Sequence, residues 1–140
     1  MAIISDLDTK FSLLAIRHGQ RGVGQTGPNP SVGCILVKNN RIVGRGVTAR
    51  GGRPHAESQA IQQAGTDCQG ATMYVTLEPC CHQGETPPCT DKIVKSGIVR
   101  VVSPLTDPDR RVSGQGFQKL REGGVKVTLI DKLQREASQL

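Results

Sequence analysis

Aromatic residues are scarce in this chain: among 140 residues there are no tryptophans, one tyrosine and two phenylalanines. Proteins that hold single-stranded nucleic acids stack the bases on aromatic side chains, and this sequence has few such side chains. The net charge is +6, but the basic residues are scattered, with Arg110 and Arg111 as the only adjacent pair. We therefore expect an anionic small molecule as the partner and do not expect nucleic acid.

The sequence also lacks a long hydrophobic run and a secretory signal. Asp6, Asp8 and Lys10 interrupt the N-terminal segment, which therefore fits neither a signal peptide nor a membrane span. We expect a cytoplasmic protein with no membrane partner. The number of cysteines, five, is odd. In a reducing compartment, clustered cysteines bind metal or react more often than they form disulfides.

The pattern of the remaining residues predicts one domain with a three-layer α/β/α architecture and a mixed sheet of about five strands. Two apolar runs around Asn39 and Asn40 predict a β-hairpin, and helices and strands alternate after it. We predict strands at 31–37, 41–47, 71–77, 98–105 and 125–130, helices at 8–19, 55–65, 89–97 and 114–123, and a last amphipathic stretch to Leu140. No glycine-rich loop matches a phosphate-binding fingerprint, so we assign no nucleotide cofactor.

Two short segments gather the residues that could carry chemistry. The sequence "PHAE" places His55 and Glu57 at the start of a predicted helix, and "EPCCHQGETPPC" ends at Cys89, which opens the next helix. A helix N-terminus lowers the pKa of a cysteine and so favours the thiolate. One imidazole and two thiolates form a three-ligand zinc set with a fourth position open, as in catalytic sites. Glu57 is the candidate general acid and base beside that metal.

Each of these two segments also has a less specific interpretation. A His-x-Glu pair can be a surface feature, and the cysteine loop alone can be a structural zinc site or a set of buried thiols. Positions two apart point about 200° apart on a regular helix, so His55 and Glu57 converge only if His55 lies before the regular helix. The combination is more specific, because His-x-Glu followed by Pro-Cys and a further cysteine is the signature of zinc deaminases.

The other cysteines have simpler interpretations. Cys34 lies in an apolar strand and is predicted to be a buried core thiol, whereas Cys68 lies in a polar loop and has no predicted role. Cys80 and its neighbour Cys81 are both possible ligands from their position alone.

The segments "PNPSVGCILV", "PHAES", "VTLEPCCHQGETPPC" and "DPDRRVSGQGFQKLREGGVKV" resemble the pyrimidine deaminase domain of riboflavin biosynthesis. In that family the domain is commonly the amino-terminal half of a bifunctional deaminase–reductase. The resemblance runs from about residue 8 to the end of the chain. Its most specific element is the spacing of eight residues between Cys80 and Cys89. Cytidine, guanine and tRNA-adenosine deaminases usually have about two residues there.

The resemblance implies a cytidine deaminase-like fold that binds one zinc ion per chain. It implies that His55, Cys80 and Cys89 are the zinc ligands, that Glu57 is the proton shuttle, that Asn29 hydrogen-bonds the base, and that His82, Asp107 and Asp109 lie near the substrate. The family reaction is hydrolytic removal of the 2-amino group of 2,5-diamino-6-ribosylamino-4(3H)-pyrimidinone 5′-phosphate, with release of ammonia. We therefore expect a pyrimidine nucleotide as the substrate.

The chain departs from the family pattern at three positions. Thr48 stands where the family usually has histidine, Glu85 where it usually has lysine or arginine, and Arg110 follows "DPD". At about 6 Å and an effective dielectric constant of about 20, each unit charge is worth about 3 kcal/mol, so Glu85 weakens the binding of a phosphate. Our hypothesis is that Arg110, with Arg50 or Arg53, binds the anionic end instead.

Two other functions stay open at this point. The chain could deaminate another small base or nucleoside, or it could be a zinc-stabilised binding module without turnover. We expect residues 1–140 to form a single deaminase-like domain. They contain no reductase or dinucleotide motif, so we expect no NADPH-dependent activity from them. We also expect a homo-oligomer, either a dimer or a tetramer.

Overall fold

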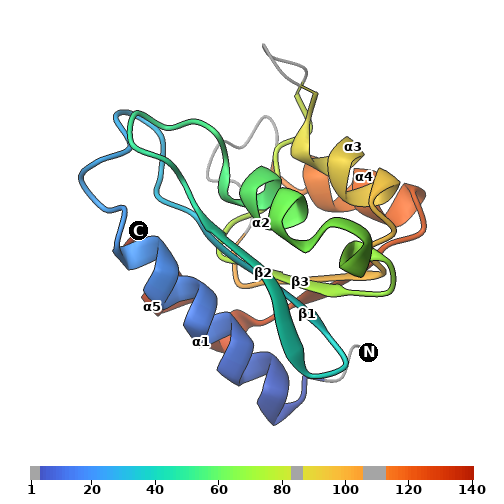
Figure 1. Ribbon diagram of the computed structural model, residues 1–140. Helices are drawn as coiled ribbons and strands as arrows, with labels where there is room; N and C mark the ends of the chain where they lie inside the picture. The colour runs from blue at the N-terminus through green and yellow to red at the C-terminus, as the bar shows by residue number, and fades with distance from the viewer. Residues whose placement is uncertain (1–3, 83–86, 106–112) are drawn as a thin grey trace.

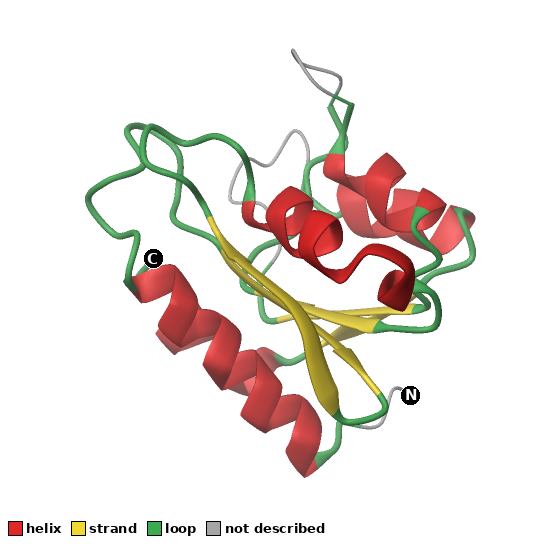
Figure 2. Cartoon of the chain, in the orientation of Figure 1, coloured by secondary structure: helices red, strands yellow, loops and turns green. Residues whose placement is uncertain are grey.

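The computed structural model describes residues 4–82, 87–105 and 113–140, in which a five-stranded sheet lies between two layers of helices (Figures 1 and 2). The strands are β1 (Gly33–Lys38), β2 (Arg41–Val47), β3 (Thr72–Val75), β4 (Arg100–Ser103) and β5 (Lys126–Leu129), in the order β2-β1-β3-β4-β5. β1 is antiparallel to both of its neighbours, and β3, β4 and β5 are parallel. The predicted mixed α/β fold is confirmed.

Each face of the sheet has its own hydrophobic core. One face packs against α1 (Asp6–Gln20), the 3₁₀ segment η2 (Asp131–Leu133) and α5 (Gln134–Ala137); the other carries α2 (Ala56–Ala64), η1 (Gly65–Cys68), α3 (Cys89–Lys95) and α4 (Gln115–Glu122). Side chains of β1 alternate between the two, with Ile35 in the core beneath α1 and Leu36 in the core beneath α2. The apolar run of β1 is therefore that of a strand buried on both faces.

The strand directions bring distant loops to one edge of the sheet. β1 runs opposite to the other four strands, so β2 and β3 end at the same edge where β1 begins. His55 follows β2, Cys80 follows β3 and Asn29 precedes β1. Ligands of open α/β sheets bind at this edge, beyond the carboxyl ends of the parallel strands.

The backbone of β2 supports the first turn of α2 directly. A Cβ atom on Gly46 would collide with the carbonyl oxygen of Ala56 and lie 3.0 Å from the Cβ of Gln59. The side-chain Nε2 of Gln59 donates a hydrogen bond to the carbonyl of Val47 at 2.6 Å. Glycine in β2 therefore lets the turn that carries Glu57 lie close against the sheet.

Most predicted elements occur within a few residues of their expected bounds, but the prediction for Cys68 was incomplete. Cys34 is fully buried, as predicted. Cys68 was placed in a polar loop without a role, but it lies in η1, is 1% exposed and belongs to the core beneath α2. Because its neighbours in "GTDCQG" are polar and exposed, the sequence pattern did not indicate that Cys68 faces the core.

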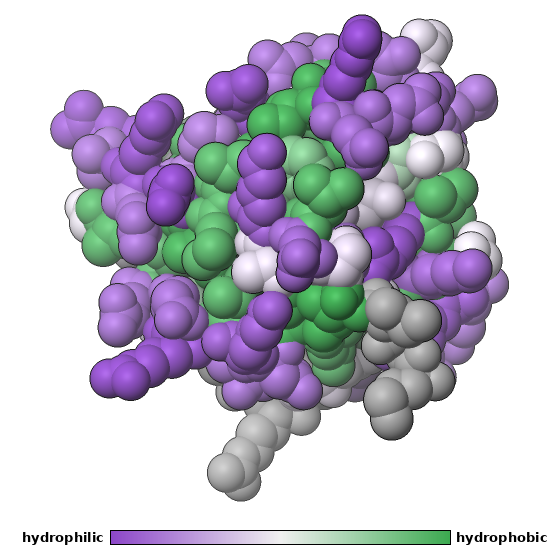
Figure 3. Space-filling view, turned by 90° about the horizontal axis from the view of Figure 1, so that it is seen from below, coloured by the Kyte–Doolittle hydropathy of each residue, from purple (hydrophilic) through white to green (hydrophobic). Residues whose placement is uncertain are grey.

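The surface carries few large hydrophobic side chains. In the described residues the exposed ones are Ile4 and Leu7 near the start of α1, and Val23, Val99 and Leu129 elsewhere in the chain. The face seen from below has hydrophobic residues interleaved with hydrophilic ones (Figure 3). None of the helices within 4–82, 87–105 and 113–140 has the length and apolar character needed to cross a bilayer.

Candidate metal and catalytic site

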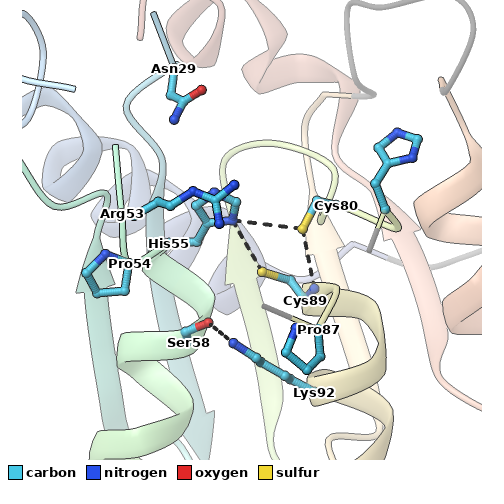
Figure 4. Close-up of a pocket in the computed structure, with 10 residues that line it drawn as sticks. Asn29, Arg53, Pro54, His55, Ser58, Cys80, Pro87, Cys89 and Lys92 are labelled. Atoms are coloured by element: carbon cyan, nitrogen blue, oxygen red, sulfur yellow. Dashed lines mark hydrogen bonds between the residues drawn. The ribbon is translucent and has the colours of Figure 1, made fainter. Parts of the chain in front are cut away.

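His55, Cys80 and Cys89 form a compact group of metal-ligating side chains (Figure 4). The Nδ1 atom of His55 lies 3.8 Å from the Sγ atom of Cys80 and 3.5 Å from that of Cys89. Two ligands at zinc distances of about 2.0 and 2.3 Å around a tetrahedral ion are separated by about 3.5 Å. The three ligand atoms, all within 4.8 Å of one another, therefore fit a zinc ion with a fourth position left over.

The position of His55 explains how two residues so close in sequence face the same site. His55 is the N-cap of α2, with an extended backbone (φ −68°, ψ 157°), and Glu57 lies in the first turn of that helix. Because His55 lies before the regular helix, the usual divergence of positions two apart does not apply. The carboxyl group of Glu57 is thus on the same side as the imidazole, as a proton shuttle requires.

Glu57 is almost fully buried, with 4% of its surface exposed, and its Oε1 atom has no hydrogen-bond partner among the described residues. Burial raises the pKa of Glu57 to about 7, and the nearby Cys80 sulfur adds to this rise. A carboxyl group with a pKa near neutrality both accepts and donates protons readily at physiological pH. An unpaired buried oxygen of this kind is a feature of functional rather than purely structural carboxylates.

A hydrogen bond joins the side chains of Cys80 and Cys89. The pKa of Cys80 is lowered to about 4, mainly by the hydrogen bond from the Cys89 thiol and also by His55 and the Cys89 backbone N–H, 3.3 Å away. The same hydrogen bond raises the pKa of Cys89, and burial raises it further. The first backbone N–H of α3 thus donates to the Cys80 sulfur and favours a negative charge there.

Two adjoining cavities open at the group. An inner cavity of about 150 Å³ is lined by Glu57 and Thr48, and an outer cavity of about 470 Å³ is lined by His82 and Arg53; both contact His55, Cys80 and Asn29. The outer volume is within the range typical of small-molecule sites. Both cavities thus place open space beside His55 and Cys80, and the outer cavity also borders Cys89.

The structure brings together Asn29 and His82, two of the predicted substrate-binding residues, as exposed side chains lining the outer cavity. Gly52 packs against the Asn29 amide so closely that a Cβ atom there would collide with Nδ2. Asp107, Asp109 and Arg110, the other predicted contacts, and Glu85 lie outside the described residues.

Glu78 is a buried residue whose role the sequence did not reveal. Its carboxylate accepts hydrogen bonds from the backbone N–H groups of Gly114 and Phe117 at 2.9 and 3.0 Å. These donors lie at the start of α4, where a helix has unpaired N–H groups. Glu78 therefore joins the loop that carries Cys80 to α4. Its position two residues before Cys80 was the only feature of the sequence that could have indicated this role.

Comparison with known families gives this geometry a context. Residues 5–104 match the cytidine and deoxycytidylate deaminase zinc-binding region. The chain belongs to this deaminase family. It is 48% identical over 127 residues to the diaminohydroxyphosphoribosylamino-pyrimidine deaminase of Buchnera aphidicola subsp. Acyrthosiphon pisum, covering 89% of this chain and 86% of that protein.

Longer proteins are similar to this chain at comparable levels of identity. The riboflavin biosynthesis protein RibD of Aquifex aeolicus is 46% identical over 138 residues, which is 99% of this chain and 38% of that protein. The structure of RibD from Acinetobacter baumannii superposes with a TM-score of 0.92 at 43% identity, covering 97% of this chain and 39% of that chain. The chain thus spans little more than a third of the length of these relatives. The recognised resemblance to the riboflavin-pathway deaminase domain is confirmed.

Proposed function

We propose that this chain is a zinc-dependent hydrolase that deaminates 2,5-diamino-6-ribosylamino-4(3H)-pyrimidinone 5′-phosphate and releases ammonia. The observation that carries the proposal is the buried Glu57 carboxyl, with its unpartnered Oε1, beside the His55, Cys80 and Cys89 group. The substrate follows from the relatives, since a protein named for this deaminase activity is 48% identical and is covered over 86% of its length.

The proposed cofactor is one zinc ion per chain, held by His55, Cys80 and Cys89. This donor set of one nitrogen and two sulfurs is the set of catalytic zinc sites in deaminases. When bound, zinc supplies Lewis acidity that makes a water molecule nucleophilic at neutral pH. Thiolate ligands must stay reduced, which is the reason that we propose a cytoplasmic location.

In the proposed reaction, Glu57 moves the protons. Its Oε1 atom accepts a proton from the attacking water and passes it to a ring nitrogen of the base. It then takes the second proton of that water from the hydroxyl group now on the ring carbon and delivers it to the amino group, so that the carbonyl forms, the carbon–nitrogen bond breaks and ammonia leaves. Asn29 borders both cavities, and in this proposal its side-chain amide hydrogen-bonds the edge of the base and orients it.

The test is an ammonia-release assay on the purified, zinc-loaded chain with the phosphorylated intermediate. We expect stoichiometric ammonia and a product heavier by one mass unit. Turnover of cytidine or another unphosphorylated base or nucleoside, but not of this intermediate, would instead support a deaminase of another small base or nucleoside. Bound zinc without turnover of any pyrimidine would support a binding module. Light scattering on the same sample tests the proposed dimer or tetramer.

A further inference from the structure

The outer cavity has two cationic side chains on its walls. Arg53 lies in the loop before α2, and Lys92 lies on α3, one turn after Cys89. In Figure 4 the Arg53 side chain overlaps the His55 ring in projection, and Lys92, on the other side of Cys89, extends from α3 toward Ser58 on α2. The cavity therefore has a positive charge on each side of the ligand group.

Neither cation is neutralised by a carboxylate in the described part of the chain. The one salt bridge there joins Arg100 and Asp8, on the far side of the sheet. The Nζ atom of Lys92 donates one hydrogen bond to the Oγ atom of Ser58 at 2.9 Å, and an ammonium group has two further protons to donate. This contact holds Lys92 across the gap between α2 and α3 and leaves donors for a ligand.

Arg53 and Lys92 line the same cavity, so a ligand bound there meets both positive charges. Two cations in a concave site attract an anion and strengthen its hydrogen bonds.

We propose that Arg53 and Lys92 form the site that binds the 5′-phosphate of the substrate, with Lys92 positioned by Ser58. The inference rests on the proposed function in one respect, namely the direction of the substrate. Glu57 lines only the inner cavity, so the reacting base lies inward and the phosphorylated end extends into the outer cavity between the two cations.

This assignment takes Arg53 from the sequence-based hypothesis about the anionic end and adds Lys92, while Arg110 lies outside the described residues. Arg50 does not line either cavity, whereas Arg53 does, and Lys92 was not considered. A phosphate site at Arg53 and Lys92 also accounts for the tolerance of glutamate at position 85. The positive charge lost there is supplied from the loop before α2 and from α3.

The test uses Arg53→Gln, Lys92→Gln and the double variant, with Arg50→Gln and Lys95→Gln as controls. Both controls remove an exposed cation close in sequence to the tested one, and neither residue lines the inner or the outer cavity. Each loaded enzyme is assayed with the phosphorylated intermediate and with its dephosphorylated nucleoside. Loss of one charged hydrogen bond raises KM for the phosphorylated substrate about tenfold or more. We expect the activity of the tested variants on the nucleoside to stay within about twofold of the wild type. The KM of both control variants for the phosphorylated substrate should also stay within about twofold.

Binding of inorganic phosphate to the zinc-loaded chain, measured by calorimetry, supplies a readout that does not depend on turnover. We expect the double variant to lose this binding, with unchanged zinc content and circular dichroism. An unchanged KM ratio or phosphate affinity in the double variant overturns the phosphate site while leaving the deaminase function standing. If the wild-type chain releases no ammonia but binds phosphate through these two residues, the function fails and the anion site stands.

Discussion

Glu57 has two properties at the scale of a single residue that rarely occur together, near-complete burial and an oxygen without a hydrogen-bond partner among the described residues. Burying an unpaired carboxyl group costs free energy, so a chain selected for stability alone would avoid it. The cavity beside Oε1 explains the cost, because a substrate and a nucleophilic water provide the missing partners during the reaction.

The substitution Glu57→Gln tests this role. Glutamine has the same shape and retains an oxygen and a polar group in the cavity, but it cannot carry a proton between atoms. We expect kcat to fall by about 10²- to 10⁴-fold, with zinc content and melting temperature nearly unchanged. Ammonia release and metal analysis on the same preparation measure both quantities, and a variant that keeps its rate would show that another group moves the proton.

The adjacent cysteines give a second test at the same scale. Cys80 lies 3.8 Å from the His55 ring, whereas Cys81 is absent from the ligand group. Burial raises the pKa of Cys81, so its thiol stays protonated. We expect Cys80→Ser to lose zinc and activity together, because serine is a poor zinc ligand. Cys81→Ser is the matched control and should keep both its zinc and its activity. Loss of zinc in Cys81→Ser but not in Cys80→Ser would mean that Cys81, and not Cys80, is the ligand.

At the scale of elements, the site depends on contacts between segments that are distant in sequence. Glu78 joins the cysteine loop to the start of α4, 36 positions further along the chain at Gly114. Gly116 allows that approach, because a Cβ atom there would collide with the carbonyl oxygen of Pro79 and lie 3.1 Å from the Cγ atom of Glu78. The helix and the loop are therefore in contact without room for a methyl group.

Gly116→Ala distinguishes close packing from helix propensity. Alanine stabilises a helix interior relative to glycine by about 1 kcal/mol, whereas overpacking costs about 1–3 kcal/mol. We expect the clash to dominate, so that the variant unfolds at lower urea concentration and binds zinc more weakly. Lys119→Ala, an exposed change in the same helix, should alter stability by less than about 0.5 kcal/mol. Higher stability in Gly116→Ala would show that α4 moves freely relative to the loop.

The difference between contacts of neighbouring residues and contacts of distant residues explains which features could be predicted from the sequence. The strand Arg41–Val47 was predicted at its observed bounds, because a hairpin is encoded by neighbouring residues. The ligand group was predicted because its residue types are rare together and the strand directions bring them to one edge. The contacts of Glu78 could not be predicted, because neither the residue type nor its neighbours in sequence indicate which distant backbone N–H groups the carboxylate will bind.

At the scale of the whole molecule, the two helical layers are joined to the sheet by different means. The layer that carries the site packs on β2 and the cysteine loop, whereas α1 is held to β4 by an ion pair between Asp8 and Arg100, 92 positions apart. The Asp8 carboxylate also accepts hydrogen bonds from the Tyr74 hydroxyl and the Ser5 backbone N–H, at 2.7 and 3.0 Å. Asp8 thus connects the N-cap of α1 to two central strands.

The pH dependence of unfolding measures the strength of this connection. Burial alone would raise the pKa of Asp8, but its hydrogen bonds, that from Arg100 first, lower it from 3.8 to about 2. A shift of nearly two pKa units corresponds to about 2 kcal/mol of stability. Because the folded-state pKa is the lower one, this contribution is fully present above about pH 4 and is lost as the pH falls toward 2.

We expect Asp8→Asn to unfold with about 2 kcal/mol less free energy than the wild type in urea at pH 6, and the difference to shrink as the pH falls from 4 to 2. Comparing both proteins in the same buffer cancels the loss of zinc at low pH, which affects them alike. Asp6→Asn is the matched control, since Asp6 is exposed in the same first turn of α1, and its effect should stay within a few tenths of a kcal/mol. A pH-independent difference for Asp8→Asn would mean that the side chain acts through its shape and hydrogen bonds alone, and not through its charge.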